Sequence, residues 1–198
     1  MNDIVVVIPT LDLAKGTDTG KLAMALAGCK VAVRVVVSVD EHREGFTKTA
    51  NKGMRAATPD EDVCLLNDDI LQFQYGWLEI LRRALYSNPR YGIAGPSGRS
   101  SSAPASGGAP GQIGTREVGQ LSFWCVLFKR EMLNELGLLG EAFIHYCSDT
   151  WYCNVMRQKG WKCVWAKAAY LKHRHHGSGI PGKWKQHDRK IYFKRLGR

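Results

Sequence analysis

The chain has 198 residues, 44% of them hydrophobic and 23% charged, which is the composition of a globular domain with a core of ordinary size. It contains no run of about 18 apolar residues, and this excludes a helix that spans a membrane. The formal net charge of +10 favours anionic partners.

The first half of the chain alternates between apolar, β-branched runs and amphipathic segments. We expect strands at residues 3–8, 31–39, 62–66 and 91–94, and helices at residues 20–28, 45–57 and 77–86. Continuous apolar runs are typical of strands that are buried on both faces of a parallel sheet. The alternation therefore predicts an α/β domain with a Rossmann-like, doubly wound, mostly parallel sheet.

The second half begins with a long segment that lacks any periodicity. Residues 96–114 are rich in Gly, Ser, Ala and Pro, which is typical of either a lid over a ligand or a disordered segment. The segments that follow are a strand at 121–128, helices at 130–136 and 149–159, and a strand at 161–166. We expect one domain over residues 1–180, followed by a basic tail at 181–198.

Positive charge is concentrated at the C-terminal end. Residues 159–198 hold 12 Lys and Arg against a single acid, Asp188, whereas the rest of the chain holds 16 basic and 17 acidic residues. Such a tail suits phosphate, nucleic acid or an anionic membrane surface. A solvated surface without a dedicated ligand explains it equally well.

The start of the chain and its cysteines indicate a cytoplasmic protein. The first residues lack the basic segment of a secretory signal. The six cysteines include no CxxC pair and lie mostly in apolar runs, so we expect buried, reduced thiols.

Polar residues follow three of the expected strands: Thr10, Asp40 and the run Asn67-Asp68-Asp69. In doubly wound sheets, ligands bind beyond the carboxyl ends of the strands. Oxygen ligands of this kind suit Mg²⁺ or Mn²⁺, which also take phosphate oxygens of a substrate. Taken alone, the Asp pair is equally consistent with a solvated turn.

Several segments, in order, resemble the large family of inverting family 2 glycosyltransferases, which have the GT-A fold. They are VVVIPT, VVSVDEH, GFTKTANKG and CLLNDDI in the first half, and LSFWCVLFKREMLNELGLLGEAF, HYCSDTWYCNVMRQKGW and AAYLKHRHHGSG in the second. The resemblance runs from about residue 3 to residue 179, with a gap over 96–114. It implies a nucleotide-sugar donor, for which a UDP-sugar is favoured, and a Mn²⁺ or Mg²⁺ cofactor.

The resemblance also implies roles for individual residues. Asp69 would ligate the metal together with His173, or else His175, and His176 is a third candidate. Asp149 would be the general base that deprotonates the acceptor. The donor would be bound by residues near the first three strands: Pro9, Thr10, Asp40, Asn51, Asn67 and Asp68. Trp151, beside the base, is a candidate for stacking on the acceptor.

Each role has a plainer alternative. Asp149 could cap a helix, Asp40 could cap a strand end, and the histidines could belong to a basic surface. The chain also departs from the family pattern at Asn67, Ser148, Trp151 and Val155. These departures leave the sugar and the acceptor undetermined.

The leading hypothesis is therefore an inverting hexosyltransferase whose acceptor hydroxyl lies on a glycan, a lipid-linked precursor, a protein or modified DNA. One alternative is a non-catalytic nucleic-acid-binding protein on a degenerate transferase fold, which the basic tail favours. Another is a nucleotidyltransferase, although residues 10–16 are a poor version of the Gly-rich basic loop that we would expect there.

Overall fold

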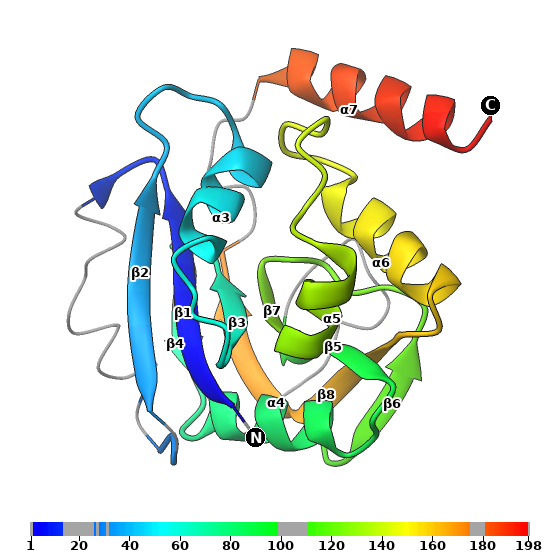
Figure 1. Cartoon of the computed structure of the whole chain (residues 1–198). Helices are drawn as coiled ribbons and strands as arrows, with labels where there is room; N and C mark the ends of the chain where they lie inside the picture. The colour runs from blue at the N-terminus through cyan, green and yellow to red at the C-terminus, as the bar shows by residue number, and fades with distance from the viewer. Residues whose placement is uncertain are drawn as a thin grey trace.

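A mixed β-sheet with helices on both faces forms the body of the protein (Figure 1). The computed structural model describes residues 2–13, 26, 28–30, 32–98, 111–174 and 181–197. The strands are β1 (Asp3–Thr10), β2 (Val33–Val39), β3 (Glu61–Leu66), β4 (Ile70–Phe73), β5 (Tyr91–Gly98), β6 (Thr115–Val118), β7 (Cys125–Phe128) and β8 (Lys162–His173). The helices are α3 (Phe46–Met54), α4 (Trp77–Tyr86), α5 (Arg130–Leu136), α6 (Ser148–Gln158) and α7 (Gly182–Arg195).

The strand order is β2-β1-β3-β7-β5-β8-β4, and β6 pairs with β8. Strand β1 is parallel to β2 and β3, and β5 is parallel to β8, whereas the pairings of β7, β4 and β6 are antiparallel. The sheet is thus mixed, which corrects the expectation of a mostly parallel sheet. A strand buried on both faces is continuously apolar in either orientation, so its sequence does not specify its direction.

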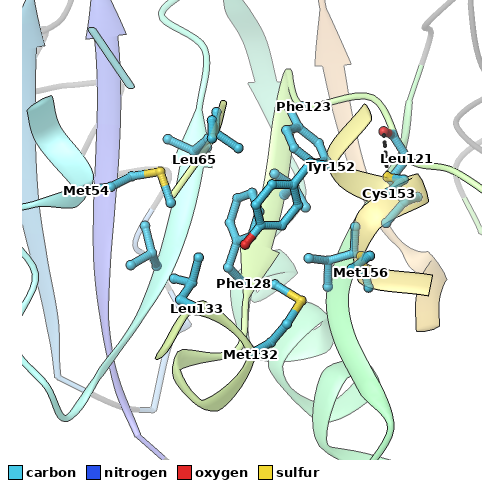
Figure 2. Close-up of a cluster of buried hydrophobic side chains, with 14 of the residues drawn as sticks. Met54, Leu65, Leu121, Phe123, Phe128, Met132, Leu133, Tyr152, Cys153 and Met156 are labelled. Atoms are coloured by element: carbon cyan, nitrogen blue, oxygen red, sulfur yellow. Dashed lines mark hydrogen bonds between the residues drawn. The ribbon is translucent and has the colours of Figure 1, made fainter. Parts of the chain in front are cut away.

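Alternate residues of β1 serve two separate cores. Val5 and Val7 pack in the core beneath α3, α5 and α6, while Ile4, Val6 and Ile8 pack in the core beneath α4. Figure 2 shows the first core, in which Met132 and Met156 lie beside the rings of Phe128 and Tyr152. Burial on both faces explains why β1 has no polar residue between Asp3 and Thr10.

Several expected elements differ in extent. The strand expected at 121–128 begins only at Cys125, although Leu121, Phe123 and Trp124 are buried. Strand β8 continues seven residues beyond its expected end, to His173. Apart from residues 26 and 28, the helix expected at 20–28 lies outside the described residues, as does most of the 96–114 segment, and residues 96–98 belong to β5.

The region expected as a basic tail contains helix α7. Its sequence has no clear apolar stripe, because the buried group that fixes it to the body is a carboxylate, Asp188. The domain boundary at residue 180 remains a prediction. None of the described helices is both long and apolar enough to cross a bilayer.

Candidate functional site

Asp69 and His173 lie side by side because two strands pair next to them. Strand β4 starts at Ile70 and runs antiparallel to β8, with Ile70 opposite His173. The N–H of Arg174 donates to the carbonyl of Asp69 at 3.0 Å. As a result, Asp69 Oδ1 lies 2.8 Å from His173 Nε2, and both side chains are mostly buried.

Trp124 stacks on His173. The two ring centroids are 5.1 Å apart and the ring planes are inclined by only 10°. The carbonyl of Trp124 accepts a hydrogen bond from the N–H of Asn67 at 2.8 Å, so Trp124 contacts both His173 and the start of the turn that carries Asp69. Its buried indole N–H has no hydrogen-bond partner among the described residues. Buried donors are nearly always satisfied, so this unpaired N–H is an uncommon feature of the site.

Thr10 connects the end of β1 to the acidic turn at residues 67–69, which follows β3. Its Oγ1 lies 2.6 Å from Asp68 Oδ2 and 2.9 Å from the carbonyl of Asp12. Its own carbonyl accepts from the N–H of Asp40 at 2.9 Å. Pro9 precedes it in β1, opposite Ser38 of β2. The ends of β1, β2 and β3 therefore meet at one edge, as the sequence predicts.

The carboxylate of Asp40 caps the turn that leads into α3. Oδ1 accepts from the N–H of Glu44 at 2.7 Å, and Oδ2 accepts from the N–H of Gly45 at 2.8 Å. Gly45 has φ 98°, and a Cβ there would lie 2.5 Å from the carbonyl oxygen of Ile144. The glycine is thus needed both for its backbone conformation and for the close approach of residue 144. A role of Asp40 in binding a donor remains a prediction.

Asn51 is engaged elsewhere. It is buried in α3, where its Nδ2 donates to the Leu139 carbonyl at 2.8 Å and to Glu141 Oε1 at 2.9 Å. Its Oδ1 accepts from the N–H of Leu139 at 3.0 Å. These bonds tie α3 to the segment after α5. None of these hydrogen bonds connects Asn51 with Asp40 or with the acidic turn.

Asp149 lies in the first turn of α6, after a residue with unusual backbone geometry. Cys147 caps this helix with φ 62°, a conformation that is uncommon for a residue other than glycine and is often found at functional sites. Asp149 Oδ1 accepts from the N–H of Thr150 at 2.7 Å, and Gln120 Nε2 donates to Thr150 Oγ1 at 2.8 Å. Burial raises the pKa of Asp149, while hydrogen bonds from Thr150 and from the backbone of Phe123 partly oppose this shift.

The consecutive residues Phe123 and Trp124 thus connect Asp149 with the Asp69–His173 pair. The backbone of Phe123 interacts with the Asp149 carboxylate, and Trp124 stacks on His173. Trp124 lies within the strand expected at 121–128, and sequence patterns alone assign it no role in the site. The one available signal was its place within a segment that resembles the family.

Trp151 has neighbours from α7. The Arg195 guanidinium lies 5.0 Å from the centroid of its ring, over one face, and Tyr192 approaches edge-on with centroids 6.5 Å apart. Phe143 lies against it with centroids 6.3 Å apart. Because Arg195 covers one face of the indole, stacking on an acceptor would have to use the remaining exposed part. This role remains a prediction.

The residues that could hold a metal are Asp69 and His173. Within the described ranges, no three His, Cys, Asp or Glu side chains gather in one place. His175 and His176 lie outside the described residues. A carboxylate oxygen and an imidazole nitrogen 2.8 Å apart form a donor pair that suits Mn²⁺ or Mg²⁺, so the residues present fit such an ion.

Comparison with known proteins gives similarity of structure but not of sequence. No protein-family model and no curated protein sequence matches the chain. Three similar solved structures are the mannosyltransferase PcManGT of Pyrobaculum calidifontis with GDP-Man and Mn²⁺, the glucosyl-3-phosphoglycerate synthase of Mycobacterium tuberculosis with Mn²⁺, UDP-Glc and phosphoglyceric acid, and GalNAc-T7 with UDP, GalNAc and Mn²⁺.

PcManGT superimposes with a TM-score of 0.69 at 16% identity, over 100% of this chain and 67% of that protein. The synthase gives 0.62 at 13% identity, over 99% and 79%. GalNAc-T7 gives 0.63 at 13% identity over 87% of this chain, which spans only 44% of that protein. At such identities the similarity establishes the fold alone. The chain has the GT-A fold of these glycosyltransferases, a single α/β domain with a central curled sheet and flanking helices.

Proposed function

We propose that this protein is a metal-dependent inverting glycosyltransferase of the family 2 type, which moves a sugar from a nucleoside diphosphate donor to an acceptor hydroxyl. The observation that carries the proposal is the Asp69–His173 pair, 2.8 Å apart, connected through Trp124 and Phe123 to the half-buried Asp149. The fold supports it, since the similar structures named above contain Mn²⁺ together with a nucleotide or a nucleotide-sugar.

Asp69 and His173 are the residues that would hold Mn²⁺ or Mg²⁺, with His175 as a further candidate. When bound there, the ion would neutralise the charge that develops on the departing diphosphate. The stack of Trp124 on His173 fixes the plane of the imidazole, and the pairing of β4 with β8 fixes the distance between the two ligands. The site would therefore be formed before the metal binds.

The donor would bind at the common edge of β1, β2 and β3. Pro9, Thr10 and Asp40 would contact its nucleoside, for which uridine is favoured. Asn67 and Asp68 would contact the diphosphate or sugar region next to the metal. The buried N–H of Trp124 supplies a hydrogen-bond donor that a ligand oxygen can satisfy.

Asp149 would act as the general base. Its carboxylate would take the proton of the acceptor hydroxyl while the new bond forms between that oxygen and the anomeric carbon. On the opposite side of the sugar, the bond to the diphosphate would break, and the anomeric configuration would be inverted. A raised pKa makes Asp149 a stronger base than an exposed aspartate, because burial destabilises its charge.

A product assay tests the proposal. The protein would be incubated with Mn²⁺ and a panel of UDP-, GDP- and other nucleotide-sugars, and release of the nucleoside diphosphate would be measured with and without pooled acceptors. We expect release with one class of donor, and we expect Asp69→Asn to abolish it. Asp60→Asn, at an exposed turn, is the matched control. If no nucleotide-sugar yields a diphosphate above the rate of Asp69→Asn, the proposal is wrong.

A further inference from the structure

Helix α7 is held in a fixed position by one buried carboxylate. Asp188 is fully buried and accepts hydrogen bonds from three consecutive backbone N–H groups, those of Ile144 at 2.8 Å, His145 at 2.8 Å and Tyr146 at 2.7 Å. The neighbouring His187 Nδ1 lies 3.0 Å from Asp188 Oδ1. The helix is therefore docked on the segment that leads into α6, a few residues before the candidate base.

Side chains on the inward face of α7 add to this docking. Trp184 stacks against His145 with ring centroids 6.5 Å apart. Tyr192 packs edge-on against Trp151 and accepts a hydrogen bond from Asn154 at 3.3 Å. Two of the three aromatic side chains of the helix, Trp184 and Tyr192, are thus used in packing against the body of the protein.

The outward face of α7 is a stripe of cations. Lys183, Lys190 and Lys194 are spaced by seven and four residues, so they lie along one side of the helix, and all three are exposed. None of them forms an ion pair within the part of the chain that the structure describes, and the only acid of the helix is the buried Asp188. At a rise of 1.5 Å per residue, the stripe is about 16 Å long.

A linear polyanion matches this stripe. One strand of B-DNA carries a phosphate about every 3.4 Å along its axis, so the stripe spans roughly five phosphates. Anionic lipid is a poorer match, because a helix that lies on a bilayer needs an apolar face for the acyl region. In α7 the inward face is occupied by packing, and the exposed apolar residues at its end are Phe193 and Leu196, each 40% exposed.

The stripe lies at the end of the molecule that carries the candidate site. Figure 1 shows α7 across the same end as the loop from β2 to α3 and the start of α6, with α4 at the opposite end. We propose that the outward face of α7 binds the sugar–phosphate backbone of a nucleic acid. That this nucleic acid also carries the acceptor hydroxyl rests on the function proposed above.

Binding of fluorescein-labelled 20-nucleotide DNA duplexes and RNA strands, measured by anisotropy over a series of salt concentrations, tests the inference. The stripe variant is Lys183→Ala, Lys190→Ala and Lys194→Ala. The control variant, Arg83→Ala, Arg90→Ala and Lys159→Ala, removes the same charge from exposed positions outside α7. We expect the stripe variant to lose at least about tenfold in affinity and the slope of log K against log salt to become shallower by about three. The control should lose much less, and both variants should keep the wild-type thermal midpoint.

Three results would overturn the inference. They are no binding of either oligonucleotide by the wild-type protein, equal losses in the two variants, or binding only to vesicles that contain anionic lipid. Nucleoside diphosphate binding by the wild-type protein is a separate readout. Diphosphate binding without oligonucleotide binding would leave the proposed function intact and reject only the role of α7. Oligonucleotide binding through the stripe without diphosphate binding would reject the proposed function and leave the role of α7 intact.

Discussion

His173 Nε2 lies 2.8 Å from Asp69 Oδ1, although the two residues are more than 100 positions apart in the chain. The contact results from the antiparallel pairing of β4 with β8, which sets Ile70 opposite His173. A carboxylate and an imidazole in such close contact form either an ion pair or two ligands of one cation. The dependence of nucleotide binding on Mn²⁺ in variants of the two residues distinguishes these cases.

Removing either member of the pair should weaken metal binding. For His173→Ala and Asp69→Asn, we expect the Mn²⁺ concentration needed for half-maximal nucleotide binding to rise on the order of 100-fold, because each change removes a direct ligand. His42→Ala and Asp60→Asn change the same residue types at exposed positions and should have little effect. Unchanged Mn²⁺ dependence in both site variants would identify the contact as an ion pair alone.

Asp149→Asn should separate catalysis from binding. The amide cannot accept the acceptor's proton, so we expect kcat to fall roughly 10²–10⁴-fold while the affinity for the nucleoside diphosphate stays within about twofold. Because burial raises the pKa of Asp149, the acid limb of kcat/KM should lie above the pH at which an exposed aspartate titrates. Full activity of Asp149→Asn would exclude this residue as the base.

Trp124→Phe should weaken donor binding. It breaks no hydrogen bond of the described structure, so no stability should be lost for that reason. The substitution keeps an aromatic ring against His173 and removes an N–H that has no hydrogen-bond partner in the described structure. We expect about a tenfold loss of nucleotide-sugar affinity by calorimetry. Trp165→Phe is the contrasting variant, since Trp165 Nε1 donates to Ser97 Oγ at 3.0 Å, and it should lose stability but keep donor affinity.

His145 should make the docking of α7 sensitive to pH. Burial lowers the pKa of His145 to about 4, despite the opposing charge of Asp188. The unfolded chain binds this proton from about pH 6.5 downward, whereas the folded protein resists it until about pH 4, so the free energy of unfolding should fall across that window by about 3 kcal/mol. Denaturant unfolding at a series of pH values measures this. His145→Phe should remove most of this fall in the free energy of unfolding, and His42→Phe should not.

Asp188→Asn should release α7. The carboxylate resists ionisation because it is buried, but hydrogen bonds from three backbone N–H groups outweigh burial and lower its pKa. Its contribution is therefore present above about pH 4 and is lost as the pH falls through the lower, folded-state pKa. We expect the variant to lose on the order of 3 kcal/mol of stability. Hydrogen exchange should show faster exchange at Ile144, His145 and Tyr146, and unchanged protection there would contradict the anchoring role.

The sequence was a good guide to elements that are buried on both faces or have a clear apolar stripe. Helices α4 and α5 begin and end at the expected residues, because their apolar positions recur at helical spacing. Strands β4 and β6 were missed, since they are four residues long and largely exposed. Helix α7 was missed because a buried carboxylate and separate aromatic contacts, rather than a continuous apolar stripe, hold it to the body.

The candidate site could be predicted only at the segments that resemble the glycosyltransferase family and occur in its order along the chain. The resemblance implied a site that combines Asp69 with His173, His175 or His176, and strand pairing brings Asp69 and His173 together. The stack of Trp124 on His173 depends on where a strand begins, which sequence patterns leave uncertain by several residues. Asn51 resembled a donor-binding residue because of its place in a motif, but its partners Leu139 and Glu141 are about 90 residues away and no local pattern reveals them.

The most direct test of the central claim is calorimetric titration of UDP, and then of GDP and other nucleoside diphosphates, with and without Mn²⁺. We expect the wild-type protein to bind one of them only when Mn²⁺ is present, and we expect Asp69→Asn to lose this binding while Asp60→Asn keeps it. If the folded wild-type protein binds no nucleoside diphosphate with Mn²⁺ or Mg²⁺ present, the claim of a nucleotide-sugar site at the Asp69–His173 pair is contradicted.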